Sequence, residues 1–237
     1  MTMNIGRRIG AVLLGTAIVA VLAACAPSGG TTADPSASST AKLPTGTNGA
    51  ADFDNGALVV GDGSTKVSTY IDPMCPYCGQ FERANGRALA EAVNKGTITL
   101  SVHPLNFLDP NSQGTNYSSR AGSALTCVAV SDPKATLTYL SALYADQPQE
   151  GSSGLTDAKL TSLAHGVGVS DADQCIASHK YASWLTSTTQ AVLKGPIPGA
   201  DITAIKGTPT VLVNGHQYGG DITDTKALLS FISKDGK

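Results

Sequence analysis

Charge of either sign is scarce in this sequence. Asp, Glu, Lys and Arg make up 14% of its 237 residues, and the formal net charge is only −2, with a pI near 6.0. A nucleic-acid surface needs an excess of Lys and Arg, so this balance argues against nucleic-acid binding. The length suffices for one domain of ordinary size with appendages.

The N-terminal apolar run, residues 9–22, is too short for a comfortable membrane span. Arg7 and Arg8 precede it as a positive n-region, and it ends in Leu-Ala-Ala-Cys at positions 22–25. This ending resembles a bacterial lipobox, which implies removal of residues 1–24 and lipidation of Cys25. Such acyl chains would hold the protein on the extracytoplasmic side of the cell membrane. An uncleaved anchor, or an ordinary signal peptide with an incidental cysteine, is the alternative.

Large apolar residues are almost absent between positions 26 and 52, where Pro, Ser, Thr, Gly and Ala dominate. Such a segment cannot bury enough surface to offset the entropy lost when it becomes ordered. We therefore predict a flexible tether over residues 25–52 and a folded domain over residues 53–237.

Cysteine is also rare, with five residues in all, and two of them form the motif Cys75-x-x-Cys78. A β-favouring segment, residues 66–71, precedes the motif, and a helical pattern, residues 80–95, follows it. At a helix start, unpaired N–H groups and the helix dipole stabilise a thiolate, which makes Cys75 a nucleophile. Cys78 lies one turn further on, where it can close a disulfide or resolve a mixed one. The pattern predicts redox chemistry.

Half of a zinc site is the competing interpretation of this motif. A zinc site would need a second ligand pair at short spacing. No such pair is present, because the four histidines are scattered along the chain: His103, His165, His179 and His216. Pro76 also favours the start of a helix over a zinc knuckle.

Two blocks of sequence resemble the thioredoxin superfamily, and specifically its DsbA-like branch of exported thiol–disulfide oxidoreductases. They are Asp-Pro-Met-Cys-Pro-Tyr-Cys at positions 72–78 and Gly-Thr-Pro-Thr-Val-Leu-Val-Asn-Gly at positions 207–215. The resemblance covers roughly residues 58–233. It implies an α/β, thioredoxin-like fold with a mixed central sheet and a helical subdomain inserted at about residues 110–195.

Local patterns agree with that layout. Residues 57–60, 67–71 and 97–105 read as strands, and the last two flank a helix in a βαβ unit, so they should be parallel. Helical periodicity occurs near residues 117–130, 134–144, 157–165 and 171–193. Asn214-Gly215 predicts a hairpin turn between two short strands, and a final helix follows from about residue 223.

The resemblance also assigns a role to Thr208 and Pro209. It implies that their peptide bond is cis and faces Cys75, which leaves the backbone before the proline able to pair with an extended substrate. The motif neighbours Pro76, Tyr77 and Asp72 complete the expected site.

Two positions depart from the family pattern. Many relatives carry a buried acid six residues before the first cysteine, where this chain has Thr69, so water or Asp72 is the candidate proton acceptor for Cys78. Strongly oxidising relatives have histidine in the place of Tyr77. We therefore expect the pKa of Cys75 to lie below that of a free thiol, but the disulfide to be a less extreme oxidant.

Cys127 and Cys175 remain, both in helical segments. Exported proteins in an oxidising compartment rarely keep two free thiols, so we predict a structural disulfide between them. Two independent buried cysteines are the alternative.

Together these features predict a lipid-anchored, monomeric thiol–disulfide oxidoreductase that forms disulfides in exported proteins with free thiols. The family implies a membrane partner of the DsbB or VKOR type that reoxidises the cysteine pair, and no metal or organic cofactor is expected. A reductase or isomerase of the cell envelope is an alternative. A non-enzymatic lipoprotein that binds a soft metal through Cys75 and Cys78 is another.

Overall fold

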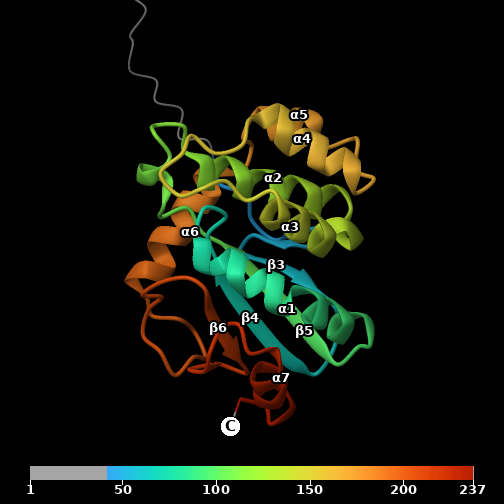
Figure 1. Cartoon of the computed structure of the whole chain (residues 1–237), viewed down its shortest axis with the longest axis vertical. Helices are drawn as coiled ribbons and strands as arrows, with labels where there is room; N and C mark the ends of the chain where they lie inside the picture. The colour runs from blue at the N-terminus through green and yellow to red at the C-terminus, as the bar shows by residue number, and fades with distance from the viewer. Residues whose placement is uncertain (1–41, 237) are drawn as a thin grey trace, which may run out of the picture. The chain divides into compact units, whose positions relative to one another are not determined.

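The computed structural model describes residues 42–236 of the chain. The predicted signal peptide, Cys25 and most of the predicted tether lie outside these residues. Within them, seven strands form one mixed sheet in the order β1-β2-β3-β5-β4-β6-β7 (Figure 1). The strands are β1 (Thr47–Asn48), β2 (Ala51–Asp52), β3 (Ala57–Val60), β4 (Thr65–Ile71), β5 (Ile98–Pro104), β6 (Thr210–Val213) and β7 (His216–Gln217).

Helices cover the sheet and form a separate group at one of its ends. Figure 1 shows α2 to α5 gathered at one end of the molecule, while α7 lies at the other. This group is the helical insertion that the sequence predicts. The helices are α1 (Pro76–Asn94), α2 (Tyr117–Ser131), α3 (Thr136–Ala145), α4 (Asp157–Gly166), α5 (Asp173–Ala177), α6 (Ala182–Lys194) and α7 (Thr225–Ser233), with short 3-10 turns η1 (Asp109–Asn111) and η2 (Pro133–Ala135). Among residues 42–236, no helix combines the length and apolar character needed to cross a membrane.

The sheet is mixed because one pair of neighbours is parallel. Strands β4 and β5 run parallel, as expected for a βαβ unit, and the other neighbouring strands are antiparallel. The predicted hairpin joins β6 to β7, and its turn residues Asn214 and Gly215 both have positive φ. Positive φ is readily adopted by Asn and Gly, which explains the hairpin signal in the sequence.

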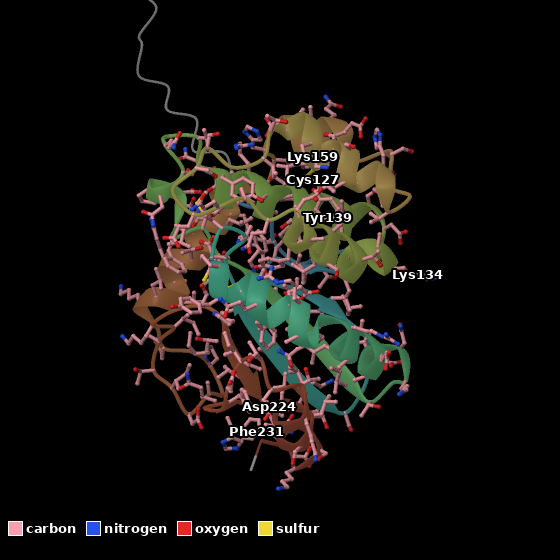
Figure 2. All side chains as sticks on the ribbon, in the orientation of Figure 1. Cys127, Lys134, Tyr139, Lys159, Asp224 and Phe231 are labelled. Carbon is pink, nitrogen blue, oxygen red and sulfur yellow. A yellow bond between two sulfur atoms is a disulfide. The ribbon has the colours of Figure 1, made fainter. Side chains whose placement is uncertain are left out.

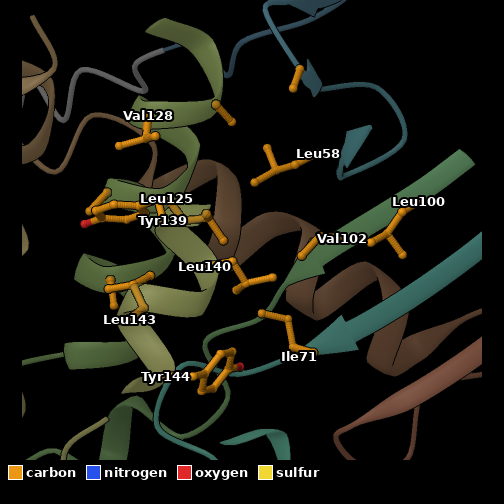
Figure 3. Packing of buried hydrophobic residues seen from close by; sticks show 14 of the residues in the cluster. Leu58, Ile71, Leu100, Val102, Leu125, Val128, Tyr139, Leu140, Leu143 and Tyr144 are labelled. Atoms are coloured by element: carbon orange, nitrogen blue, oxygen red, sulfur yellow. The ribbon is translucent and has the colours of Figure 1, made fainter. Parts of the chain in front are cut away.

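The main core lies between the sheet and the helices. Because side chains alternate along a strand, Ile71 of β4 and Val102 of β5 point to the same face. Figure 3 shows these strand residues facing Leu140 and Tyr144 of α3. These side chains are buried, and each buried large apolar side chain contributes about 1.5–3 kcal/mol relative to an exposed one. The core thereby fixes the carboxyl end of β4, where the cysteine motif begins.

Helix α1 starts where the sequence motif predicts it. Pro76 occupies the first helical position, where its missing N–H costs nothing, and Cys75 is the N-cap. Phe81 and Leu89 are buried on one face of the helix. Gly96, just after the helix, has φ +65° and so ends it.

The predicted tether is too long at its C-terminal end. Residues 47–52 form β1 and β2 instead, and Ala51 is only 1% exposed. The backbone N–H of Ala50 donates to the carbonyl of Ala129 in α2 at 2.8 Å. A Cβ at Gly49 would lie 2.5 Å from that same carbonyl oxygen. Small residues therefore allow close backbone contact here, and this contact needs no large apolar side chain.

The predicted helix over residues 171–193 is also wrong in detail. The helical pattern over residues 171–193 is two helices, α5 and α6, rather than one. His179 between them has φ +50°, which interrupts the helical backbone. The N–H of Tyr181 then donates to the Ser123 hydroxyl at 3.0 Å, which holds the turn against α2.

Cys127 and Cys175 form the predicted disulfide. It joins α2 to α5, with a Cα–Cα distance of 5.8 Å, and the two cysteines are 48 residues apart. Figure 2 places Cys127 at the helical end of the molecule, opposite Phe231 of α7. In the chain-entropy model, closing a loop of this length stabilises the fold by about 4 kcal/mol.

Candidate active site

The two motif cysteines differ in their access to solvent. Both are free thiols in the structure, and both are buried, although to different degrees. Cys75, 5% exposed, ends a tight turn in which its N–H donates to the carbonyl of Asp72 at 3.0 Å. Cys78 is completely buried in the first turn of α1. The exposed residues between them, Pro76 and Tyr77, form the surface of the motif, and Tyr77 is 62% exposed.

The surroundings of the two thiols shift their pKa values in opposite directions. The pKa of Cys75 is lowered to about 6, chiefly because the Cys78 thiol donates a hydrogen bond to it. The N–H groups of Tyr77 and Cys78 lower it further, against the opposing effect of burial, while the Oγ1 atom of Thr208 is buried without a hydrogen-bond partner. Burial and the neighbouring Cys75 raise the pKa of Cys78 well above its usual value. Cys75 is therefore suited to be the nucleophile, and Cys78 to be the buried partner thiol.

The loop before β6 brings the second sequence block to the sulfurs. The Thr208–Pro209 peptide bond is cis. The Cys75 thiol donates to the carbonyl oxygen of Thr208 at a distance of 3.4 Å. A groove of about 690 Å³ begins at this loop and extends to Asp201 and Gln217. The structure thus brings together the four residues that the sequence singled out from two distant blocks.

Asp72 lies buried directly beneath this site. Its carboxylate accepts hydrogen bonds from the N–H of Met74 at 2.9 Å, the N–H of Leu108 at 3.0 Å and the Ser118 hydroxyl at 2.6 Å. The backbone N–H of Asp72 lies 3.5 Å from the Cys78 sulfur and donates to it. Burial raises the pKa of the carboxyl to about 7, although its three hydrogen bonds act in the opposite direction. Asp72 therefore exchanges a proton near neutral pH.

Three residues of the helical insertion hold the redox loop, and sequence reasoning missed all of them. Besides Ser118, the Tyr144 hydroxyl donates to the carbonyl of Asp72 at 3.1 Å. The Gln147 amide donates to the carbonyls of Pro73 at 3.1 Å and Cys75 at 2.8 Å. They lie at least 40 residues from the motif, and no local pattern identifies them.

A second acid, the half-buried Glu82, lies one helical turn after Cys78 in α1. It lines a small cavity together with Thr69, at the position where many relatives carry an acid, and with Leu140 of α3. Burial raises the pKa of Glu82 to about 7. Sequence reasoning missed Glu82, although the helical spacing could have found it, because it follows Cys78 by four residues on the face that carries Phe81.

The histidines belong to other parts of the fold. His103 is buried, stacks on Tyr70 with ring centroids 4.2 Å apart, and lies 3.0 Å from the carbonyl of Gly56 through Nδ1. His165 and His179 lie 2.7 Å and 2.8 Å from Asp carboxylates. Within residues 42–236, no group of three or more His, Cys, Asp or Glu side chains is placed to hold a metal ion.

The chain matches known proteins over this whole region. The family described as Thioredoxin matches residues 54–234. The reduced form of the disulfide bond oxidoreductase DsbG from Mycobacterium tuberculosis has a TM-score of 0.65 at 30% identity, covering 75% of this chain and 86% of that one. Oxidised DsbA of the same organism has a TM-score of 0.64 at 30% identity, covering 76% and 93%.

Two further matches are more distant in sequence or cover only part of the chain. BdbD from Bacillus subtilis shares the fold, with a TM-score of 0.62 at 21% identity, covering 81% of this chain and 98% of that one. The serine/threonine-protein kinase PknE of Mycobacterium tuberculosis is 41% identical over 119 residues, which are 48% of this chain. This chain spans only 21% of the length of that kinase.

The geometry and the matches agree on one chemistry. A low-pKa thiol at a helix start, a buried partner thiol and an opposing cis-proline loop are the parts that thiol–disulfide exchange requires. The matched family covers most of the described residues. The chain belongs to the thioredoxin family and is a DsbA-like thiol–disulfide oxidoreductase.

Proposed function

We propose that this protein donates disulfides to exported proteins, through Cys75 and Cys78. The observation that carries the proposal is the position of Cys75 at the start of α1, where a hydrogen bond from Cys78 and nearby N–H groups lower its pKa to about 6. A group that stabilises the reduced form of a dithiol makes its disulfide a stronger oxidant. The hydrogen bond from Cys78 and the donors at the start of α1 act in this direction.

The reaction begins from the oxidised pair. A substrate thiolate attacks the Cys75 sulfur, the Cys75–Cys78 bond breaks, and its electron pair moves to Cys78, which then takes up a proton. A second substrate thiolate attacks the substrate sulfur of the mixed disulfide, and Cys75 leaves as a thiolate. Starting from two thiols, the substrate has then lost two electrons and two protons. The protein holds a Cys75 thiolate and a Cys78 thiol, and the second proton has gone to solvent.

Burial selects which sulfur is attacked. Cys78 is completely buried, whereas Cys75 faces the carbonyl of Thr208 at the end of the groove. An extended substrate segment that pairs with the backbone of Thr208 would place its thiol beside Cys75. Asp72, whose N–H reaches the Cys78 sulfur and whose pKa is raised to about 7, is our candidate for moving the proton of Cys78.

We further propose that the protein is exported and lipid-anchored at Cys25, on the extracytoplasmic side of the cell membrane, and that it acts as a monomer. The lipobox-like sequence at residues 22–25 supports the anchor. A membrane redox partner of the DsbB or VKOR type would reoxidise the pair. Intact-mass measurement of the purified membrane form tests the anchor, because Cys25→Ala should abolish the added acyl mass.

The reduction potential of the Cys75–Cys78 pair tests the direction of the reaction. Equilibration with glutathione should give a value towards roughly −120 to −180 mV, which is the range of disulfide donors. A value near −270 mV would overturn the donor assignment in favour of a reductase. The Cys127→Ala/Cys175→Ala variant is the control. If it has the same reduction potential, the measured potential belongs to the motif cysteines and not to Cys127 and Cys175. A pair that never cycles but binds Cu(I) tightly would support a metal-binding protein instead.

A further inference from the structure

The loop after α3 reaches the redox motif through one side chain. Gln147 lies in this loop, and its Nε2 donates to the carbonyl oxygens of Pro73 at 3.1 Å and Cys75 at 2.8 Å. A side-chain amide has two N–H groups, so both of its donors are used on the backbone of the motif. The helical insertion is thereby tied to the residue that carries the nucleophile.

The site for Gln147 exists because position 79 is glycine. A Cβ at Gly79 would lie 2.0 Å from Oε1 of Gln147, closer than atoms can approach. Gly79 lies in the first turns of α1, where glycine costs roughly 0.5–1 kcal/mol relative to alanine. The missing side chain leaves the space that the Gln147 amide occupies, which gives this glycine a packing role.

Gln147 acts together with Tyr144 from the same side of the motif. Tyr144 donates to the carbonyl of Asp72, and Gln147 donates to the carbonyls of Pro73 and Cys75. These contacts hold three of the four carbonyls that precede Pro76. Hydrogen bonds from the helical insertion therefore help to stabilise the turn that carries Cys75, in addition to its connection to the sheet.

The contact also changes the electrostatics at the sulfur. The carbonyl of Cys75 accepts a hydrogen bond from the N–H of Gly79 at 3.2 Å and a second from Gln147. A carbonyl oxygen is the negative end of a dipole, and it opposes a negative charge on the sulfur of the same residue. Each N–H that points at this oxygen offsets part of that effect.

We propose that Gln147, seated over Gly79, is a positioning residue that orders the redox loop and stabilises the Cys75 thiolate. It thereby makes the Cys75–Cys78 disulfide a stronger oxidant than the motif alone would be. The proposal concerns the exchange reaction itself, and it holds whether the protein works as a donor or as a reductase.

The first test replaces Gln147 and measures the cysteines. Gln147→Met keeps most of the side-chain volume but removes both donors. The alkylation rate of Cys75 should then reach half its maximum at a higher pH. The equilibrium constant for reduction by glutathione should fall about fivefold, which corresponds to ~20 mV for a two-electron couple. Gln149→Met is the matched control, because Gln149 is exposed in the same loop and should leave both quantities unchanged.

The second test uses the space at Gly79. Gly79→Ala should displace the Gln147 amide and lower the same equilibrium constant by a similar factor. In a Gln147→Ala background the added methyl meets only the flexible end of Arg83, whose Nη1 would lie 2.9 Å away and can move, so Gly79→Ala should have almost no further effect on the potential. This non-additivity is the signature of a shared mechanism. Unchanged reactivity and potential in Gln147→Met would overturn the proposal, and so would additive effects in the double variant.

Discussion

The sulfur of Cys75 lies 3.4 Å from the carbonyl oxygen of Thr208, although the two residues are 133 positions apart in the chain. A carbonyl can accept a hydrogen bond from the Cys75 thiol, but it cannot donate one to the thiolate. The thiolate must therefore be stabilised by other groups, which are the Cys78 thiol and the N–H groups of Tyr77 and Cys78. The same carbonyl belongs to the backbone that we expect to pair with substrate.

Among the groups around Cys75, the Cys78 thiol should have the largest effect on the pKa of Cys75. Its hydrogen bond is the main cause of the lowered pKa of Cys75, so Cys78→Ala should raise that pKa by about one unit or more. The pH dependence of iodoacetamide alkylation measures this. The same variant should accumulate a mixed disulfide with substrate at Cys75, because no resolving thiol is left. An unchanged alkylation profile would contradict the hydrogen-bond explanation.

Thr208 should tune the same thiol through its hydroxyl. The Oγ1 atom of Thr208 is buried and has no hydrogen-bond partner, so its hydroxyl can turn toward a thiolate at Cys75. Thr208→Val keeps the shape of the side chain but removes this donor, so the pKa of Cys75 should rise by up to roughly half a unit. The disulfide should become slightly less oxidising, as measured against glutathione. Thr203→Val is the control, because Thr203 lines the same groove but does not affect the pKa of either sulfur. Equal shifts in both variants would assign the effect to the groove in general.

Asp72 should give the exchange reaction a pH dependence of its own. Its pKa is raised to about 7, so the carboxyl is protonated, and able to supply a proton to Cys78, only below neutral pH. Asp72→Asn should slow reduction of the disulfide by a small dithiol roughly tenfold at pH 6 and have little effect above pH 8. Asp62→Asn, at an exposed position, is the control. Equal slowing at both pH values would indicate a structural effect instead.

The structural disulfide should affect stability but not redox chemistry. Replacing Cys127 and Cys175 together by alanine should lower the free energy of unfolding by about 4 kcal/mol, as expected for a loop of this length. Urea unfolding of the two forms measures the difference. The alkylation profile of Cys75 should remain the same, because the bridge joins α2 to α5, away from the motif. A changed profile would show that the helical insertion transmits strain to the site.

Local patterns predicted the parts of this protein that depend on local chemistry. The strand before Cys75, the helix that begins at Pro76 and the hairpin at Asn214 each follow from neighbouring residues. The strands at residues 47–52 did not, because their own side chains are small. They are held by the ladder from β2 to β3, by backbone contact with α2 and by the burial of Ala50 and Ala51 in the core. Gln147 was missed for a related reason: its position is set by the packing of α3, and its partners are carbonyl groups, which every residue has.

Glu82 should make the stability of the fold depend on pH. Its pKa is raised from 4.5 to about 7 by burial, so the folded state keeps a proton that the unfolded chain has lost. Its contribution to stability is therefore fully present below about pH 4.5 and is lost as the pH rises through 7. In Glu82→Gln this loss cannot occur. The variant should resemble the original protein at pH 4.5 and exceed it in stability by about 3 kcal/mol at pH 8.

Urea unfolding at the two pH values tests this, with the Cys75–Cys78 disulfide formed so that neither motif cysteine titrates. Glu91→Gln is the matched control, because Glu91 lies on the same helix, is exposed and pairs with Arg87 at 2.9 Å. It should change the stability by less than about 0.5 kcal/mol at either pH. A Glu82→Gln variant with the same stability difference at both pH values would show that the carboxyl is already ionised in the folded protein. The cavity it shares with Thr69 would then be solvated, and burial could not account for its pKa.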